Sequence, residues 1–268
     1  MFVSVCFGYR RPALSAMLYL FGFCIAIEPA LAGMFYIDGH GDIGVGYEPV
    51  DPMDLLGPKN LHPHWHLGDG AGTSVVGLPM VTDAEFEPQE ITAVVPLSSK
   101  FSNPGGITWS FLGTSSGADV FFLPQNNPPG VVIPFLGIAS EELEPAEWSN
   151  LIWKISLSGA PPGNFSIFSN GIFGPSILYS SLLGPSSFPT AIGSHDHFNL
   201  AFTQPGFYDL DITISGNHTI DGMKTASGTF QFFVGDISSV PEPNSTALVT
   251  SAWLIVFSRR TQRSKRRS

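Results

Sequence analysis

The residues best suited to chemistry in this chain are histidines, and most of them occupy alternate positions in short segments. The segment 61–67 holds His62, His64 and His66, three of the seven histidines in the chain. In an extended segment, residues two apart point the same way, so these three imidazoles can face one side. Neutral imidazole binds zinc, copper, nickel and iron alike. The segment is therefore a candidate metal site, and its spacing leaves the metal open.

Two further segments combine histidine with a carboxylate beside small turn residues, and they contribute the candidates His40, Asp42, His195, Asp196 and His197. A His-x-His pair can direct two imidazoles at one ion, and two such pairs nearly complete a four-coordinate shell. A neighbouring carboxylate can fix a histidine tautomer through the distal ring nitrogen. We therefore expect the three segments to converge on one ion.

The expected site has four histidine ligands, which are His40, His64, His195 and His197. Asp42 or Asp196 is expected to be a further ligand or to orient a ligand. The site would take about one metal ion, held by four donors. His218 is the one histidine outside the three segments.

Two known enzyme patterns do not fit these histidines. A metallo-hydrolase of the His-x-His-x-Asp-His kind needs Asp where His66 stands. Multicopper oxidases contain His-Trp-His, but their electron-transfer copper requires a cysteine thiolate, and Cys6 and Cys24 both lie in the N-terminal leader. A zinc hydrolase would need an open coordination position and a nearby carboxylate base. A metal-dependent hydrolase therefore ranks behind the non-enzymatic interpretations.

The N-terminus predicts an export signal. Arg10 and Arg11 precede an apolar run over 13–27, and Ala30-Leu31-Ala32 has the small-x-small pattern that signal peptidase cuts. The run is short for a membrane span, which needs about twenty residues. We expect residues 1–32 to be removed after Ala32. The remaining domain, 33–239, has no cysteine and hence no disulfide or thiolate ligand.

The C-terminal residues 240–268 contain the tripeptide Pro241-Glu242-Pro243, then an apolar segment, then an arginine-rich tail. In this order they resemble the PEP-CTERM sorting signal of Gram-negative bacteria. The resemblance implies that exosortase recognises Pro241, Glu242 and Pro243 and cuts the chain near them. The short apolar segment would anchor the protein transiently in the cytoplasmic membrane, with the basic tail inside. The expected location is then the cell surface or the extracellular space.

Between its two ends the chain is strongly acidic. Of the 22 acidic residues, only Glu28 and Glu242 lie outside 33–239, whereas the strong bases within that range are Lys59, Lys100, Lys154 and Lys224. Binding to nucleic acid depends on lysine and arginine at phosphates. The composition therefore argues against a nucleic-acid partner and favours a soluble, cation-tolerant surface.

The middle of the chain predicts an all-β domain. Residues 151–157 and 207–214 alternate apolar and polar side chains with the period of a strand, and further short apolar runs are separated by Gly, Pro and Asn. The turn Pro205-Gly206-Phe207-Tyr208 is typical of sandwich domains with a tyrosine at a strand corner. We expect an antiparallel β-sandwich of Greek-key or jelly-roll type.

Three local expectations concern the site. His40 should lie at a turn between two short strands, 34–37 and 42–47. Residues 61–67 should form an edge strand or a loop, because Pro63 cannot donate to a ladder. Residues 140–148 should form a helical turn capped by Ser140.

A family resemblance combines these segments. Residues 39–45, 62–66 and 194–202, followed by the Pro-Gly-Phe-Tyr turn, resemble the choice-of-anchor M domain over residues 34–235. With the Pro-Glu-Pro tail, the chain is most similar to the zinc-uptake-regulator-repressed PEP-CTERM proteins. Members usually show a more regular Gly-His-x-Asp-Ile followed by His-x-His. The resemblance, rather than the spacing, implies zinc and production when zinc is scarce.

Two classes of function follow. In the first, the protein captures or buffers zinc outside the cytoplasmic membrane. In the second, it is a structural or glycan-binding sandwich of the envelope, associated with extracellular polysaccharide, whose histidines only brace loops.

Overall fold

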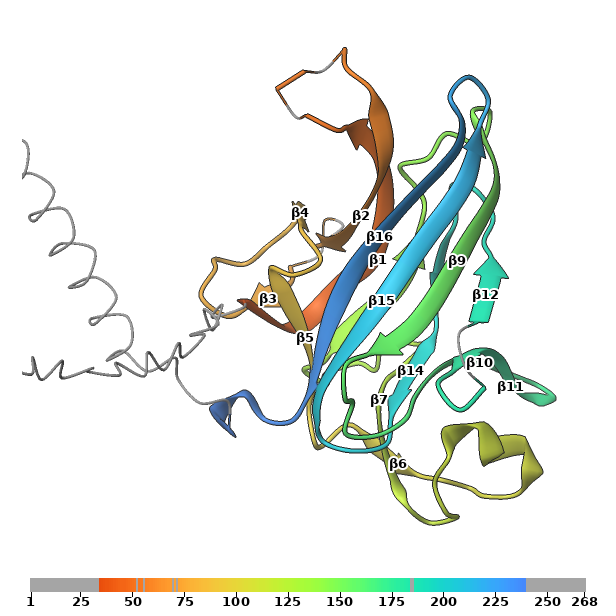
Figure 1. Ribbon diagram of the computed structural model, residues 1–268. Coiled ribbons are helices and arrows are strands. Elements are labelled where there is room, and N and C mark those ends of the chain that lie inside the picture. The colour runs from red at the N-terminus through yellow and green to blue at the C-terminus, as the bar shows by residue number, and fades with distance from the viewer. Residues whose placement is uncertain are drawn as a thin grey trace, which may run out of the picture. The chain divides into compact units, whose positions relative to one another are not determined.

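The computed structural model describes residues 34–239 except 52, 55, 69, 71, 184 and 185. The signal and sorting segments expected at 1–32 and 240–268 lie outside these residues. The described chain is all-β, as predicted, with two sheets and two short 3-10 helices, η1 (Ile107–Leu112) and η2 (Ile237–Ser239) (Figure 1). Within it, no helix is long and apolar enough to cross a membrane.

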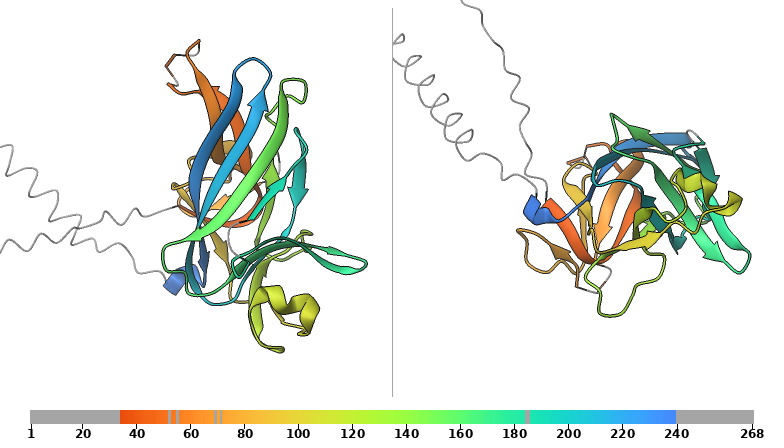
Figure 2. Two further views of the ribbon diagram at one scale, coloured as in Figure 1. Left: turned by 45° about the vertical axis from the view of Figure 1, so that its right-hand side comes forward. Right: turned by 90° about the horizontal axis from the view of Figure 1, so that it is seen from below.

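The first sheet has eleven strands, eight of which form one hydrogen-bonded path. In spatial order, the path runs through β12 (Ser186–Pro189), β9 (Trp148–Ser158), β15 (Gly206–His218), β16 (Gly222–Val234), β5 (Ile91–Val95), β1 (Met34–Pro49), β2 (Lys59–Leu67) and β4 (Ala84–Phe86). Beside it, β3 (Ser74–Val75) and β8 (Pro134–Ala139) pair with β1, and β13 (His195–His197) pairs with β8. The long strands β9, β15 and β16 lie side by side (Figure 2).

The second sheet has five strands, in the order β11 (Gly174–Ser180), β10 (Phe165–Gly171), β14 (Asn199–Phe202), β7 (Asp119–Leu123) and β6 (Lys100–Ser102). All its pairs are antiparallel. The first sheet differs from the prediction, because β1 runs parallel to β5 and β8, and β5 runs parallel to β16. Period-two alternation identifies a strand and its buried face, but it carries no information on the direction of the neighbouring strand.

The two sheets share an aromatic core. The rings of Phe165 in β10 and Phe202 in β14 lie 6.3 and 5.5 Å from the ring of Phe232 in β16, and all three side chains are fully buried. Trp65 in β2 joins them, with its ring 5.7 Å from Phe232. Because Trp65 points into this core, its chain neighbours His64 and His66 point to the opposite face of the first sheet.

The predicted tyrosine corner is present at the start of β15. The Tyr208 hydroxyl donates a hydrogen bond to the Gln204 carbonyl at 2.8 Å, and burial raises the pKa of Tyr208 to about 12. Its ring lies 5.0 Å from that of Phe202. The corner therefore fixes the start of the long β15–β16 hairpin against the second sheet.

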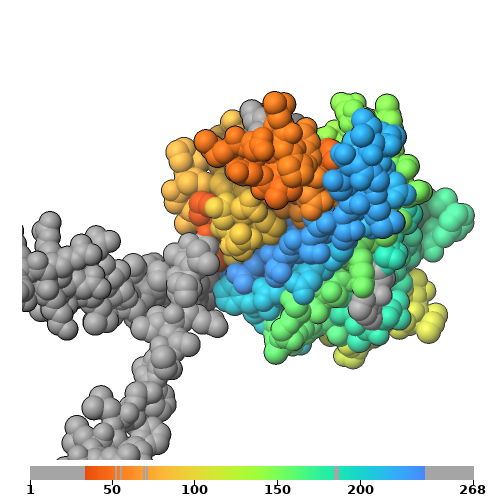
Figure 3. Space-filling view, turned by 45° about the horizontal axis from the view of Figure 1, so that its top comes forward, coloured from red at the N-terminus to blue at the C-terminus, as the bar shows by residue number. Residues whose placement is uncertain are grey.

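The β15–β16 hairpin also contacts β2 at its far end. Lys224 donates to the carbonyl of Lys59 at 2.8 Å, and Asn60 donates to the carbonyl of Thr225 at 3.4 Å. In Figure 3 the orange surface that includes β2 adjoins the blue surface of the hairpin. β2 is thus held between this contact and its pairing with β1.

We expect Phe202→Ala to lower the free energy of unfolding by about 3–5 kcal/mol, because it leaves a cavity among the rings that join the two sheets. Urea unfolding of the purified protein measures the change. Phe173→Ala is the control, since Phe173 is 97% exposed and its loss should stay within about 0.5 kcal/mol. Equal losses for the two variants would contradict a shared aromatic core.

Candidate metal centre

Strand β1 carries His40 and Asp42 on one face of the first sheet. The structure has one strand from Met34 to Pro49 where a turn at His40 was expected. Gly39 has a φ of 93°, and a Cβ there would come within 2.7 Å of the Gly72 carbonyl oxygen, so glycine suits this position. Before Gly39, β1 pairs with β5 and β3. From Gly39 onward, it pairs with β8 and β2.

Strand β8 lies between β1 and β13 and brings His40 beside residues more than 150 positions later in the chain. Gly137 in β8 is opposite Asp42 in β1 and also opposite His197 in β13. Cross-strand partners point to the same face. A Cβ on Gly137 would overlap Asp42 Oδ1 and would lie 3.2 Å from His195 Cδ2. Gly137 therefore leaves free the volume in which side chains of β1 and β13 meet.

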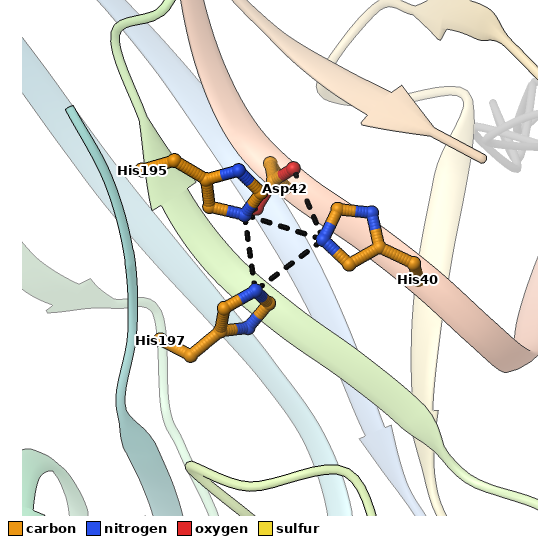
Figure 4. Close-up of side chains that lie close together, drawn as sticks. All are labelled: His40, Asp42, His195 and His197. Carbon is orange, nitrogen blue, oxygen red and sulfur yellow. Dashed lines mark hydrogen bonds and ion pairs between the residues drawn. The ribbon is translucent and has the colours of Figure 1, made fainter. Parts of the chain in front are cut away.

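The Nε2 atoms of His40, His195 and His197 form a small triangle (Figure 4). Its edges are 3.2 Å from His40 to His195, 3.3 Å from His40 to His197 and 3.0 Å from His195 to His197. A tetrahedral shell with metal–nitrogen bonds of about 2.0–2.1 Å has edges of about 3.3 Å. The triangle thus has the dimensions of one face of such a shell.

Hydrogen bonds cannot satisfy this triangle. Each edge needs one N–H and one lone pair, and an Nε2–H can point along only one edge. Every protonation state therefore leaves at least one edge with two like groups facing each other. A cation in the centre would accept all three lone pairs at once.

Asp42 supplies a fourth donor. Its Oδ1 lies 3.0 Å from His195 Nε2 and its Oδ2 lies 3.7 Å from His40 Nε2. The Asp42 side chain is 5% exposed, and its Oδ1 has no hydrogen-bond partner of good geometry. A buried carboxylate needs a positive charge beside it, and either a protonated His195 or a bound cation would supply that charge here. We call His40, Asp42, His195 and His197 the β1–β13 site.

Neighbouring groups orient two of these imidazoles. The Glu141 Oε1 lies 3.3 Å from His195 Nδ1, the nitrogen that faces away from the triangle. The His197 ring stacks on Phe135, with centroids 3.8 Å apart and an angle of 7°. A carboxylate on the distal nitrogen of a ligating histidine is the usual way to fix its tautomer.

The pKa values of two histidines in the β1–β13 site are shifted in opposite directions. The hydrogen bond to Asp42 raises the pKa of His195 to about 9, although burial opposes the shift. Burial lowers the pKa of His197 to about 4, and the charges of His195 and His40 act in the same direction. Without metal, the cluster therefore holds a proton on His195 at neutral pH, while His197 stays neutral.

The histidines of β2 form a second row on the same face. Asp42 is opposite His66 and Gly44 is opposite His64, so His64 lies one cross-strand pair further along β2. Successive residues on one face of a strand are about 6.6 Å apart. His64 is fully buried, with its Nε2 2.9 Å from Glu142 Oε1. The group whose donor atoms converge thus contains Asp42 as its fourth member, and His64 belongs to a separate group with His66 and Glu142.

Two other candidates also lie apart from the β1–β13 site. Asp196 is exposed and alternates with His195 and His197 along β13, so it faces the other side of that strand. His62 has Glu48 and Glu87 oxygens 3.0 and 3.1 Å from its two ring nitrogens. Neither residue belongs to the groups whose donor atoms converge.

Pro63 fits the strand prediction for 61–67. β2 pairs with β1 along its whole length, but β4 pairs only with Trp65, His66 and Leu67. Pro63 therefore lies where β2 has a strand partner on one side only, and its missing N–H costs no ladder bond there.

The segment after β8 differs from its prediction and contributes residues that the prediction missed. It forms two turns, with Leu143 N–H bonded to Ser140 O at 3.0 Å and Glu147 N–H bonded to Glu144 O at 2.9 Å, and no helix. Glu141 and Glu142 follow β8 after Ser140 and reach His195 and His64 respectively. The acidic run was visible in the sequence, but it was interpreted as the first turn of a helix.

Comparisons of the chain with protein families, with curated proteins and with solved structures found no match.

We expect histidine NMR titration of the metal-free protein to give a pKa of about 9 for His195 and about 4 for His197. His195 is raised above its unfolded value of 6.5, so its pairing with Asp42 stabilises the fold fully below pH 6.5, and this contribution is lost as the pH rises towards 9. His197 is lowered, so the fold loses stability as the pH falls from 6.5 towards 4.

Asp42→Asn should return the pKa of His195 towards 6.5 and remove its pH-dependent contribution to stability. Asp196→Asn, on the other side of β13, is the matched control and should leave the titration of His195 unchanged. A normal pKa for His195 in the unsubstituted protein would show that the Asp42 contact does not form in solution.

Proposed function

We propose that this chain is an exported zinc-binding protein that captures or buffers zinc outside the cytoplasmic membrane. The observation that carries the proposal is the convergence of the Nε2 atoms of His40, His195 and His197 beside the Asp42 carboxylate. The three imidazole nitrogens fit a cation better than they fit one another, because at least one edge of their triangle has two like groups facing each other.

The shape of the triangle favours zinc over copper(II) or nickel(II). In a square-planar shell, two of any three donors are trans to each other and about 4 Å apart. Here the longest of the three nitrogen–nitrogen distances is 3.3 Å. Zinc has no geometric preference from d-electrons and usually takes a tetrahedral shell of this size. The resemblance to zinc-repressed proteins points to the same metal.

Binding alone suits the donor set better than catalysis does. Catalytic zinc sites usually keep one position for water or substrate, whereas sites with four protein donors are closed. A pocket lined by Gly39, His40 and residues 127–132 opens beside the cluster, and it offers an ion a route in and out. The imidazoles of His40 and His195 keep 14% and 18% of their surface exposed, which also suits exchange with solution.

The remaining parts of the proposal concern the fold type and the two ends of the chain. The two packed sheets fit a β-sandwich, and the Tyr208 corner supports that assignment. Signal peptidase would cut after Ala32. Exosortase would act at Pro241-Glu242-Pro243 after a transient membrane stage, releasing the domain to the cell surface or to extracellular polysaccharide.

Zinc titration of the purified protein, against a competing chelator, should show about one tightly bound ion at pH 7. The double variant His195→Ala, His197→Ala should lose this tight binding and keep its circular dichroism spectrum. Binding to the unsubstituted protein should weaken as the pH falls from about 9, where His195 of the metal-free protein takes up its proton, because protonated imidazole cannot ligate.

His218→Gln is the control for the double variant, since His218 lies outside the β1–β13 site and bonds instead with the Asp221 N–H at 3.1 Å. It should bind zinc like the unsubstituted protein. If zinc stoichiometry and affinity are unchanged in the double variant, the proposed site is wrong.

Intact-mass measurement of the protein released from cells should show a chain that begins at Gly33 and ends near Pro241-Glu242-Pro243. A variant with Pro241 and Pro243 both changed to Ala should stay with the membrane and keep its basic tail. Recovery of residues 259–268 on the released form would contradict processing at this motif.

A further inference from the structure

The histidines of β2 do not belong to the β1–β13 site, and two of them, His64 and His66, face the Glu142 carboxylate. We propose that His64, His66 and Glu142 form a second zinc site, separate from the β1–β13 site and weaker than it. One donor atom from each of the three residues lies within 4.8 Å of the others.

The His64 ring is set up as a ligand by its distal nitrogen. Nδ1 lies 3.0 Å from the His62 carbonyl oxygen, which can only accept a hydrogen bond. Nδ1 therefore carries the proton, and neutral His64 turns the lone pair of Nε2 towards Glu142 Oε1 at 2.9 Å. Two acceptors then face each other unless a proton or a metal ion lies between them. A backbone carbonyl on the distal nitrogen is also the common arrangement around ligating histidines.

The His66 ring repeats this arrangement with the nitrogens exchanged. Nε2 lies 2.9 Å from Asp83 Oδ1, and Nδ1 lies 3.5 Å from the same Glu142 Oε1. Two imidazoles thus direct one nitrogen each at a single carboxylate oxygen. His62 differs, because its two nitrogens face Glu48 and Glu87, and it does not belong to the group of His64, His66 and Glu142.

Extra carboxylates surround this group. Glu48 and Glu85 each offer an oxygen within 4.8 Å of Glu142, which makes Glu142 common to two clusters. Burial and the charges of Glu142 and Glu48 raise the pKa of Glu85, although His64 opposes the shift. In the described part of the chain, the ion-pair partners of Glu48 and Glu142 are imidazoles and no lysine takes part. A divalent cation would offset this negative charge.

Glycines of β1 keep the space above β2 open. Gly44 is opposite His64, and a Cβ there would lie 2.8 Å from His64 Nε2. Gly46 is opposite His62, and a Cβ there would lie 2.6 Å from Glu142 Oε2. Side chains at either glycine would displace the donors, so their absence preserves the group.

Exposure explains why the second site is the weaker one. His66 and Glu142 keep 29% and 31% of their side-chain surface in contact with solvent, whereas the Asp42 side chain of the β1–β13 site keeps 5%. Water competes for an exposed ion and screens its charge. The second ion should therefore bind less tightly and exchange faster.

Equilibrium dialysis of the purified protein against increasing zinc should show a second, weaker equivalent. Glu142→Gln and His66→Gln should each weaken this equivalent at least tenfold and leave the tight one unchanged. Glu144→Gln is the matched control, from the neighbouring turn. His64 is not substituted, because it is buried. The double variant His195→Ala, His197→Ala should lose the tight equivalent and keep the weaker one, which separates the two sites.

The outcomes separate the two proposals. Uptake of one equivalent that Glu142→Gln does not change would overturn the second site and leave the β1–β13 site standing. A weak equivalent that survives with no tight one would support the second site and contradict the first. Calcium is the probe for a purely carboxylate cluster. If calcium competes as well as zinc, and His66→Gln has no effect, then the imidazoles are not ligands and the proposal fails.

Discussion

The pairing of β8 between β1 and β13 is the constraint on which the β1–β13 site depends. Gly137 is the residue that the two outer strands share, and it lies opposite both Asp42 and His197. Neighbouring strands are about 4.8 Å apart, so side chains from β1 and β13 must reach over β8 to meet. They can do so only because the strand between them has no side chain at that point. A shift of β8 by one residue would put Leu136 or Ile138, both core residues, on the site face.

The same strand order determines where the chain crosses between the sheets. β13 ends at His197 on the first sheet, and β14 begins at Asn199 on the second. The site therefore lies where the two sheets are joined covalently, next to the core that holds them together. The Ser140 amide donates to the Ser194 carbonyl at 2.8 Å, which fixes the segment before β13 to the turn after β8. Both halves of the β1–β13 site are thus supported by ordered backbone.

Much of the site could be predicted from the sequence, because alternation along a strand is a local property. His195 and His197 were identified from their spacing, and His40 and Asp42 were identified as a histidine and a carboxylate beside glycines. The position of His64 could not be predicted from the sequence, because it depends on the register that sets Asp42 opposite His66. Glu141 and Glu142 were missed for a related reason. Their role follows from the parallel pairing of β8 with β1, and no local pattern encodes that pairing. The fold shows the same limit, since several strands and the tyrosine corner were predicted but the parallel pairs were not.

The donors of the β1–β13 site have a chemical consequence of their own. Imidazole and carboxylate groups do not take part in thiol–disulfide exchange, and they are not oxidised to sulfenic, sulfinic or sulfonic acid as cysteine is. An ion held by His40, His195, His197 and Asp42 would therefore be insensitive to the redox state of its surroundings. Acid or a competing chelator would still remove it, because both act on the donors or on the ion directly. The metal occupancy of such a site would change with pH and with metal supply, and it would not change with oxidants.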